Sequence, residues 1–524
     1  MRPPIIWSIA GTDSSGGAGL AADQRAADAF GVHLCPVVAA VTAQNSCGVA
    51  RIEPLPVAWI DAQLEALARD LPPLAIKTGL LGGVAQIECV ARWIDRLRRE
   101  RPVALVVDPV LAASTGAAFA DPATLQAYVD LLLPRASVIT PNLREARQLA
   151  QQPLSIGDEP ASAIPALARQ LRGEGAASVC ITGGDSPELA PSEALDWLHS
   201  PHAEGWLAAP RIATADTHGT GCTFATGIAA ALALGYVDAD AMILSKMATA
   251  QALRHGHPAG SGAGPVMARH GFHADPALLP RMSWGEVPQF MPLPAPAALS
   301  SRPLGLYAVV DSADRVAQAL RAGLRTVQLR IKMPAQSTPS WQADLRDNIA
   351  RSVAACRAAD AELFINDHWE LALALGASGV HLGQEDLLAL GETGRTALQR
   401  SGLRLGISSH SLWELCRARA LAPRYIACGP VWPTLTKAMP WQPQGLDNLR
   451  WWNAMAGAPI VAIGGILKPE QVRDAAGCGV SGVCVVRALD NDMAQTVPPL
   501  VAALEQGQAS RETSDPLAWP HPAL

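Results

Sequence analysis

The sequence predicts two α/β domains in one chain: an open sheet wound with helices, and then a compact (β/α)8 TIM barrel. A stretch with five prolines, 284–303, divides the 524 residues, and such a stretch forms a stiff extended spacer rather than a helix or a central strand. Before it, apolar strand-like runs alternate with segments of helical period. After it, eight short strand candidates, each followed by helix-compatible sequence, fit within about 200 residues, the lower end of the size range for this barrel.

The elements follow in order along the chain. In the first half the strand candidates are IIWSIAG, ALVVDPV, SVITPN and SVCITGG, and a helix is predicted where Ile60, Leu64, Leu67 and Leu71 recur at helical spacing. In the second half the strand candidates are LYAVV, TVQLR, LFIND, GVHL, LGIS, YIACGP, IVAIGG and GVCVV. From Gln508 the sequence loses its periodicity, which predicts a disordered tail. The expected boundaries are 1–283 for the first domain, 284–303 for the linker, 304–507 for the barrel and 508–524 for the tail.

Composition narrows the choice of partners. A net charge of −6, spread along the chain, argues against a general nucleic-acid binder. The ten cysteines form no CxxC pair and no Cys/His cluster, a pattern typical of reduced cytosolic thiols rather than disulfides or a zinc site. The longest apolar tract, FATGIAAALALGYV, is shorter than a bilayer span, and the N-terminus resembles no secretory signal. We expect a cytoplasmic protein that binds small molecules and copies of itself as a homo-oligomer, without nucleic-acid or membrane partners.

Three glycine-rich segments lie at predicted strand-to-helix junctions: 11–19, 182–184 and 216–227. In the last of them Gly219, Thr220 and Gly221 precede an alanine-rich helix, so their backbone amides can form an anion hole at its positive end. Phosphoryl transfer needs such a cradle, because its transition state spreads negative charge over the moving group. For any one segment, a tight turn with a helix cap is an equally good interpretation. The chain has neither a Walker loop nor the protein-kinase motifs, so a kinase here belongs to another class.

Six motifs identify that class. GTDSSGGAGLAAD, TAQNSCGV, KTGLL, VDPV, TPNLREA and THGTGCT resemble, in order and spacing, the hydroxymethylpyrimidine and phosphomethylpyrimidine kinases, whose fold is a ribokinase-like α/β/α sandwich. The resemblance implies ATP as the phosphoryl donor and an aminopyrimidine as the acceptor. It assigns Asp23 and Gln44 to the aminopyrimidine, Asp108, Glu145, Thr182 and Thr220 to Mg-ATP, and Gly219, Gly221 and Cys222 to catalysis.

The role of Cys222 has two interpretations. A helix N-terminus lowers the pKa of a thiol, which favours a base or a hydrogen-bond partner for the substrate hydroxyl. Alternatively, Cys222 is a small buried apolar residue, the usual place of a free cysteine. Two residues depart from the family pattern: Thr182 stands where a lysine is usual, and Leu80 where a methionine is usual.

In the second domain the run TVQLRIK alternates polar and apolar residues. Period-two geometry places Gln328, Arg330 and Lys332 on one face. In a barrel strand the polar set lines the interior and rises towards the carboxyl-terminal mouth, where barrel active sites lie. A solvated strand face is the alternative, but helices normally cover parallel strands.

More polar residues follow the later strands. Asp367 and Asp386 stand at the ends of adjacent strand candidates, which suits a Mg²⁺ ion that holds pyrophosphate, although either aspartate alone is more simply a helix N-cap. GPVWPTLTK provides a loop for oxyanions, and the turns after the seventh and eighth strand candidates match the standard barrel phosphate site. The residues concerned are Asn366, Ser408, Thr434, Thr436, Lys437, Gly464, Gly465, Val486 and Arg487.

From Leu306 to Leu489 the chain resembles thiamine phosphate synthase, through QLRIK, IND, HLGQED, GISSHS, GPVWPTLTK and AIGGI. The resemblance implies that pyrophosphate leaves first and that the thiazole nitrogen captures the resulting cation, so no general base is needed. Mg²⁺, Arg330 and Lys437 would stabilise the departing anion. The pyrimidine diphosphate is assigned to Gln328, Arg330, Lys332, Asn366, Ser408 and Lys437, Mg²⁺ to Asp367 and Asp386, and the thiazole phosphate to Thr434, Thr436, Gly465, Val486 and Arg487. Arg487 replaces a usual serine.

These resemblances predict a bifunctional enzyme of thiamine synthesis. Thr182 and Arg487 also leave room for a second hypothesis, in which one domain has become a ligand-binding or scaffolding module. A third makes the first domain a pyridoxal or sugar kinase, because a shared fold does not fix the substrate.

Overall fold

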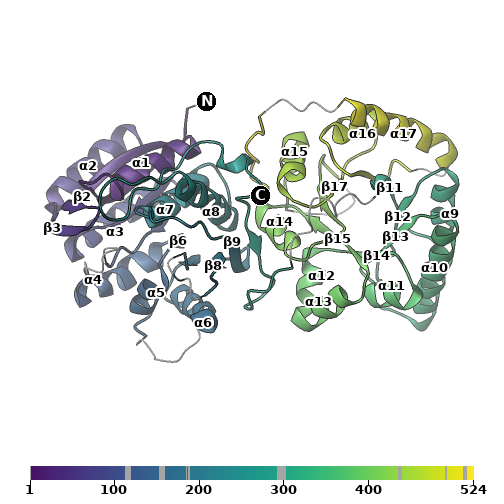
Figure 1. The fold of residues 1–524 in the computed structure, drawn as a ribbon, viewed down its shortest axis with the longest axis horizontal. Helices are drawn as coiled ribbons and strands as arrows, with labels where there is room; N and C mark the ends of the chain where they lie inside the picture. The colour runs from purple at the N-terminus through teal and green to yellow at the C-terminus, as the bar shows by residue number, and fades with distance from the viewer. Residues whose placement is uncertain are drawn as a thin grey trace. The chain divides into compact units, whose positions relative to one another are not determined.

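The computed structural model describes residues 2–112, 120–152, 160–184, 186, 189–291, 302–434, 440–489, 492–510 and 516–524. The chain divides into two compact units, Met1–Pro288 and Gln289–Leu524 (Figure 1), and the division falls inside the predicted spacer. The predicted succession of an α/β/α sandwich and a (β/α)8 barrel is confirmed by the topology of the sheets.

The first unit is built on one ten-stranded sheet with the order β10-β9-β8-β7-β6-β5-β4-β1-β2-β3. The six strands β7, β6, β5, β4, β1 and β2 are parallel neighbours, whereas the flanking strands pair antiparallel. The strands are β1 (Ile5–Gly11), β2 (His33–Asn45), β3 (Gly48–Pro54), β4 (Ala75–Thr78), β5 (Ala104–Val107), β6 (Val138–Ile139), β7 (Val179–Thr182), β8 (Glu193–His199), β9 (Glu204–Pro210) and β10 (Arg281–Met282).

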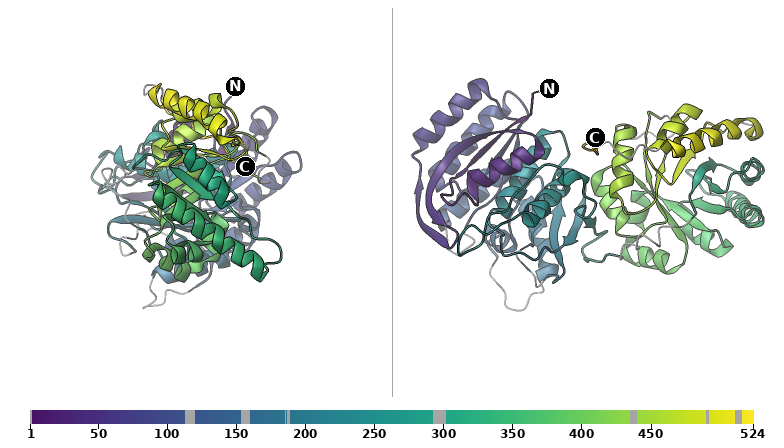
Figure 2. Two further views of the ribbon diagram at one scale, coloured as in Figure 1. Left: turned by 90° about the vertical axis from the view of Figure 1, so that its right-hand side faces the viewer. Right: turned by 45° about the horizontal axis from the view of Figure 1, so that its top comes forward.

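Helices cover both faces of this sheet (Figure 2). They are α1 (Gly19–Phe30), α2 (Val57–Asp70), α3 (Val84–Arg98), α4 (Pro122–Ala127), α5 (Leu143–Leu149), α6 (Pro160–Gly173), α7 (Thr220–Ala233) and α8 (Asp238–Arg254), with the short turns η1 (Tyr128–Leu132), η2 (Leu133–Arg135) and η3 (Phe272–Ala274). The predicted helix around Ile60 and Leu64 is α2, and both residues are buried. α7 packs closely on α8 because its small residues allow it: a Cβ on Gly227 would come within 2.5 Å of Ser245 Oγ.

The second unit is a closed barrel of eight parallel strands, in which the last strand pairs with the first. The strands are β11 (Gly305–Val310), β12 (Thr326–Leu329), β13 (Glu362–Asn366), β14 (Gly379–Leu382), β15 (Arg404–Ser409), β16 (Tyr425–Cys428), β17 (Ile460–Ala462) and β18 (Gly482–Val485). Tyr307, Phe364 and Tyr425 fill the interior, with edge-to-face ring contacts of Tyr425 to the other two at 5.6 and 5.1 Å between centroids.

The helices of the second unit follow its strands. They are α9 (Ala313–Arg321), α10 (Pro339–Ala358), α11 (Trp369–Leu375), α12 (Gln384–Ala389), α13 (Gly391–Arg400), α14 (Leu412–Arg419), α15 (Gly445–Met455), α16 (Pro469–Gly477) and α17 (Met493–Ala509). In the described part of the chain, no helix has the length and apolar character needed to cross a membrane.

The end of the chain differs from the predicted disordered tail. α17 continues to Ala509, past the expected boundary at Gln508. Residues 516–524 then pack on the barrel unit: the His521 amide donates to Asn448 Oδ1 at 2.8 Å, and the Gln442 amide donates to the Ala523 carbonyl at 2.8 Å. Side-chain and backbone hydrogen bonds hold this segment on the barrel unit. The hydrophobic periodicity of the sequence cannot predict such bonds.

Candidate active sites

The first site lies at the carboxyl edge of the parallel strands in the first unit. β1, β4 and β5 are parallel neighbours that end at Gly11, Thr78 and Val107. Because these ends lie at one edge of the sheet, the segments that follow them come together there. Three of the six kinase motifs quoted above, GTDSSGGAGLAAD, KTGLL and VDPV, lie at this edge.

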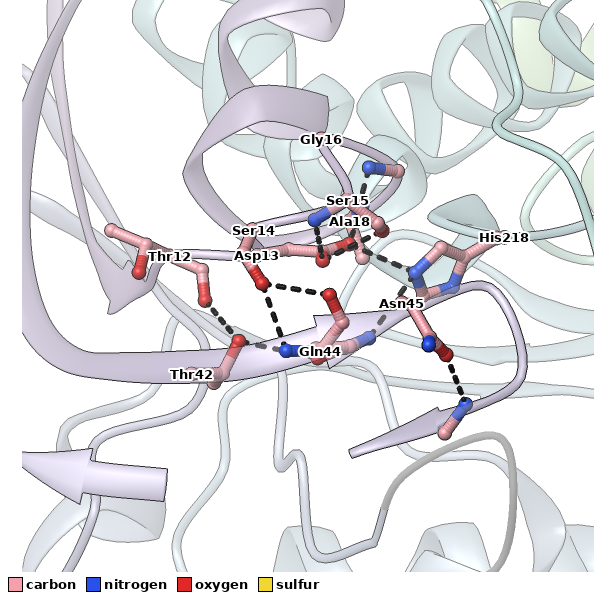
Figure 3. Close-up of polar contacts among 12 residues, drawn as sticks. Thr12, Asp13, Ser14, Ser15, Gly16, Ala18, Thr42, Gln44, Asn45 and His218 are labelled. Carbon is pink, nitrogen blue, oxygen red and sulfur yellow. Dashed lines mark hydrogen bonds and ion pairs between the residues drawn. The ribbon is translucent and has the colours of Figure 1, made fainter. Parts of the chain in front are cut away.

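Asp13 organises the loop between β1 and α1. Its Oδ1 accepts hydrogen bonds from the amide and hydroxyl of Ser15, at 2.8 and 2.7 Å, and its Oδ2 accepts from the amides of Gly17 and Ala18, at 3.1 and 2.8 Å (Figure 3). His218 Nε2 lies 2.9 Å from the same Oδ2. Burial acts to raise the pKa of Asp13, but the hydrogen bonds from His218, Ser15 and the backbone outweigh it and hold that pKa well below its ordinary value. Asp13 is therefore a fixed anion that ties the β1 loop to the α7 loop.

Gln44, the predicted aminopyrimidine ligand, lies beside this network. Its backbone is held by Ser14, whose hydroxyl donates to the Gln44 carbonyl at 2.7 Å and accepts from the Gln44 amide at 2.8 Å. Its side-chain nitrogen lies 3.3 Å from His218 Nε2 (Figure 3). The half-buried Gln44 is thus positioned by residues from two different loops, those that precede α1 and α7.

A buried group of charges stands behind this loop. Lys77, on β4, is fully buried; its Nζ lies 3.0 and 3.1 Å from the two carboxylate oxygens of Asp23 and 3.6 Å from Asp108 Oδ2. Burial alone would lower the pKa of Lys77, but the charge of Asp23 leads the effects that raise it well above its ordinary value. Lys77 is accordingly a permanent cation in this site.

The structure gives Asp23 a role that differs from the predicted one. Asp23 is fully buried, and besides Lys77 it accepts hydrogen bonds from Ser8 Oγ at 2.6 Å and Thr226 Oγ1 at 2.8 Å. Four donor contacts leave its carboxylate little capacity for a ligand. Asp23 holds the ammonium of Lys77 in place.

The entrance of α7 has the features of the predicted anion hole. Gly219 has a left-handed φ of 90°, and a Cβ there would come within 2.3 Å of the Gly17 carbonyl, so only glycine fits. Gly221, in the first turn, is exposed, and no other described residue lies within 4 Å of where its Cβ would stand. The first amides of a helix lack intrahelical acceptors. With Thr220 between these two glycines, the turn offers donors to an anion in open space.

Cys222 does not have the lowered pKa that its place on the helix suggests. Burial raises the pKa of its thiol to about 12, although the charge of Lys77 acts in the opposite direction. Of the roles considered for Cys222, this raised pKa disfavours the base and leaves a hydrogen-bond partner or a small packed residue. Cys222 is a protonated thiol at neutral pH.

The remaining residues assigned to Mg-ATP follow neighbouring strands. Asp108 comes directly after β5, and burial raises the pKa of its carboxyl to about 6 against the opposing charge of Lys77. Glu145 forms a capping box with Asn142 at the start of α5 and also reaches the Leu111 amide at 3.4 Å. Thr182 ends β7, where its amide donates to the Pro141 carbonyl at 2.9 Å. The three follow the neighbouring strands β5, β6 and β7 at one edge of the sheet, and their assignment to a nucleotide stays a prediction.

The second site is the carboxyl-terminal mouth of the barrel. Gln328 is buried inside, and its Nε2 donates to the Tyr307 hydroxyl at 3.1 Å, in agreement with the predicted alternation. β12 ends at Leu329, so Arg330 is half-buried at the rim and Lys332 is exposed beyond it. Asn366 ends β13 and is buried, and Ser408 lies on β15.

The two predicted metal ligands follow adjacent strands. Asp367 is exposed, has a left-handed φ of 66°, and donates its amide to the His381 carbonyl on β14 at 3.1 Å. Asp386 is exposed too, and its Oδ2 accepts the Gly383 amide at 2.9 Å at the start of α12. Among the described residues no group of three or more His, Cys, Asp or Glu side chains could hold a metal ion. A pair of carboxylates fits Mg²⁺, which commonly takes one or two carboxylates together with substrate phosphates.

The loops after β16 and β17 meet each other. Gly464 and Gly465 both have left-handed φ, and a Cβ on either would collide with the segment Pro430–Trp432, which leads to Thr434. Val486 is half-buried and Arg487 is exposed in the turn after β18. Thr436 and Lys437 lie outside the described residues, which omit 435–439 in this loop.

Three residues of the first site, Lys77, Asp13 and His218, lie in the motifs quoted above but have no predicted role. A lysine inside AIKT, an otherwise apolar parallel strand, was a usable signal, because a charged residue in such a strand is buried and needs a partner. His381, within GVHL on β14, carries the same signal.

Comparison with known proteins agrees with this division into two sites. Residues 13–267 match the phosphomethylpyrimidine kinase family, and residues 306–489 match the thiamine monophosphate synthase family. A probable thiamine biosynthetic bifunctional enzyme of Oryza sativa is 33% identical over 93% of this chain and 86% of its own length. A hydroxymethylpyrimidine/phosphomethylpyrimidine kinase of Synechococcus elongatus is 39% identical over 51% of this chain and 97% of its own length. A thiamine-phosphate synthase of Neisseria meningitidis is 48% identical over 36% of this chain and 87% of its own length. The chain therefore belongs to the thiamine biosynthetic bifunctional enzymes, with a hydroxymethylpyrimidine/phosphomethylpyrimidine kinase followed by a thiamine-phosphate synthase.

Proposed function

We propose that the first unit phosphorylates 4-amino-5-hydroxymethyl-2-methylpyrimidine twice with ATP, and that the barrel joins the resulting diphosphate to thiazole phosphate with release of pyrophosphate. The observation that carries this proposal is the pairing, in one chain, of two sites suited to phosphate. One combines the open first turn of α7 with the buried Lys77 and Asp108, and the other combines Gln328, Ser408 and a carboxylate pair at a barrel mouth.

In the kinase, Gln44 would bind the aminopyrimidine, since a carboxamide offers one donor group and one acceptor to a ring with both. The amides of Gly219, Thr220 and Gly221 would receive the negative charge that develops on the moving phosphoryl group. Because the Cys222 thiol stays protonated, its role would be to donate a hydrogen bond, and not to remove the substrate proton. In a loose phosphoryl-transfer transition state, removal of the proton of the attacking hydroxyl by a general base contributes little to the rate.

The nucleotide would lie along the edge formed by Asp108, Glu145 and Thr182, and membership of the kinase family implies that it is ATP. Asp108 is the residue best placed to hold Mg²⁺, because it is next to the buried Lys77 and directly follows a strand. When bound, Mg²⁺ supplies charge neutralisation between the phosphates of the donor. Lys77 keeps Asp108 mainly ionised at neutral pH despite its burial.

In the synthase, Gln328, Asn366 and Ser408 would hold the pyrimidine diphosphate, with Arg330 and Lys332 towards its phosphates. Asp367 and Asp386 would hold Mg²⁺ against the same diphosphate, which stabilises pyrophosphate as a leaving group. The thiazole phosphate would lie against Thr434, Gly465 and the turn of Val486 and Arg487, the usual position of phosphate in such barrels. Thr436 and Lys437 belong to this proposal on the resemblance alone.

A coupled assay on the full chain tests the proposal. ATP, Mg²⁺, the aminopyrimidine and thiazole phosphate should give thiamine phosphate, and the pyrimidine diphosphate should replace ATP and the aminopyrimidine. Asp108→Asn should abolish only the first route, and Asp367→Asn should slow both routes when Mg²⁺ is limiting. No thiamine phosphate at saturating substrates rejects the proposal, and one inactive unit that still binds its ligand supports the scaffolding hypothesis. Pyridoxal as the better acceptor for ATP would identify the first unit as a pyridoxal kinase.

Two expectations stay predictions. Ten cysteines that carry thiols support a cytoplasmic location, which fractionation of the source cells would test. The expected homo-oligomer can be tested by light scattering coupled to size-exclusion chromatography.

A further inference from the structure

A chain of five polar side chains crosses the interior of the barrel. Gln328 Nε2 donates to the Tyr307 hydroxyl at 3.1 Å, and the hydroxyls of Tyr307 and Tyr425 lie 2.7 Å apart. The Tyr425 hydroxyl lies 2.9 Å from His381 Nδ1, and His381 Nε2 lies 3.0 Å from Ser408 Oγ. The chain thus joins Gln328 to Ser408, two residues assigned to the pyrimidine diphosphate, through three residues with no assigned role.

Packing fixes the middle of this chain. Tyr307, Tyr425 and His381 are buried. The His381 ring is stacked on the Tyr425 ring, with centroids 5.7 Å apart and planes 13° apart, and Tyr307 meets Tyr425 edge-to-face. A side chain held on both its face and its polar edge has little rotational freedom. Ser408, half-buried at the mouth, is the end of the chain whose hydroxyl this column can orient.

The donors and acceptors have a consistent order. An amide N–H can only donate, so Gln328 Nε2 directs its proton to Tyr307. Tyr307 can then donate to Tyr425, and Tyr425 to His381 Nδ1. His381 Nε2–H remains to donate to Ser408 Oγ. The reverse order would point two donors, Gln328 and Tyr425, at the single oxygen of Tyr307 and leave its own proton to find another acceptor.

The charge state of His381 fits the same order. Burial, followed by the positive charge of Arg330, lowers the pKa of His381 to about 4. A neutral imidazole carries one proton, so Nδ1 can accept from Tyr425 while Nε2 donates. A cationic imidazole would have to donate at both nitrogens and would break the chain.

We propose that His381 is a positioning residue of the synthase: by donating to Ser408 Oγ, it turns the Ser408 O–H outward as a hydrogen-bond donor to an oxygen of the pyrimidine diphosphate. Without that bond Ser408 can point its proton back at a ring nitrogen and present only lone pairs to the anion. The inference rests on the proposed synthase function and deepens it. It concerns the binding of the diphosphate, and not of the thiazole phosphate.

A double-mutant cycle on the full-length protein tests the inference. The variants are His381→Asn, Ser408→Ala, the double variant and Tyr425→Phe, each assayed with pyrimidine diphosphate and thiazole phosphate as substrates. Ser408→Ala should lower kcat/KM for the diphosphate about tenfold to a hundredfold, the range for a lost hydrogen bond to a charged group. His381→Asn should lower it about tenfold and Tyr425→Phe less, with the KM for thiazole phosphate unchanged. In the Ser408→Ala background, His381→Asn should cost less than about twofold.

The kinase activity of the same molecule provides an internal control for folding and concentration. Additive losses in the double variant would overturn the inference, because His381 would then act on the substrate or the fold without Ser408. A Ser408→Ala enzyme with wild-type kcat/KM would overturn it as well. Failure of the proposed function is distinguishable from both: the wild-type chain itself would then form no thiamine phosphate from the two substrates.

Discussion

Replacement of Lys77 by methionine should destabilise the kinase unit strongly. Methionine matches the length of the buried stem but leaves Asp23 and Asp108 without their cation. Breaking a buried ion pair in this way costs about 3–5 kcal/mol. Here the lower part of that range is expected, because Ser8 and Thr226 still donate to Asp23. In addition, the pKa of Asp108 is about 6 beside Lys77 and higher without it, so protonation of Asp108 at pH 7 costs no more than about 1.4 kcal/mol.

Scanning calorimetry of the full chain measures this loss. A cost of about 3 kcal/mol corresponds to a fall in Tm of roughly 6–12 °C for a unit of this size. Only the transition of the first unit should move. The matched control is Lys332→Met, which removes an exposed lysine from the barrel unit and should leave both transitions in place.

The pH dependence of the loss carries a definite sign. In the variant Asp108 loses the nearby charge of Lys77, so its pKa in the folded protein, which burial already holds above the ordinary value, rises further. The folded state then binds more protons, and its stability falls as the pH increases through that interval. The deficit of Lys77→Met should therefore be smaller at pH 5 than at pH 8. A Tm within about 2 °C of wild type at pH 8, or a larger deficit at pH 5, would refute the electrostatic account of this site.

Four further outcomes follow from the structure. Because Asp108 has a pKa of about 6, kinase kcat/KM should fall about tenfold per pH unit below pH 6, and synthase activity in the same samples should not share that limb. Cys222→Ala should lower kinase kcat less than about tenfold, since removal of a true general base costs about 10²–10⁴-fold. A loss in that higher range would support the hypothesis that Cys222 acts as a thiolate base. Asp367→Asn should raise the Mg²⁺ concentration for half-maximal synthase activity at least about tenfold and leave that of the kinase unchanged, as a titration of each activity will reveal. Deletion of residues 516–524 removes the bonds of Asn448 with His521 and should lower the Tm of the barrel transition by a few degrees, about 1–3 kcal/mol in stability; an unmoved transition would mean that the segment is unimportant.

The strands and helices could be predicted from the hydrophobic periodicity of the sequence, because that periodicity depends only on residues close together in the chain. Alternation in TVQLRIK correctly placed Gln328 inside the barrel, where it bonds to Tyr307. The same rule does not hold at Lys332. β12 ends at Leu329, and side chains alternate between the two faces only within a strand. The predicted disordered tail was wrong for residues 516–524, because lack of periodicity excludes a helix or a strand but not a segment held by hydrogen bonds.

Which side chains contact each other in the kinase site depends on how neighbouring strands pair. The sequence around any one residue says little about that pairing. Ser8 and Lys77 are neighbours across β1 and β4, and both reach Asp23 on α1. Nothing within a few residues of Lys77 indicates that pairing. What the sequence does show is a polar residue in a short, buried parallel strand, and in both units such a residue, Lys77 or His381, belongs to the polar network behind the site.

Burial first, and the charge balance of the kinase site second, explain why the Cys222 thiol is neutral. A helix N-terminus can lower a thiol pKa by several units when the thiol is open to solvent or next to free positive charge. Here the one buried cation, Lys77, is already shared by Asp23 and Asp108, so the group carries about one net negative charge when all three are ionised. A thiolate would add a second negative charge beside it, and burial adds a further penalty. A site with surplus negative charge favours a divalent cation over another anion, which agrees with the proposal of a metal-nucleotide partner for Asp108 and argues against a thiolate base at Cys222.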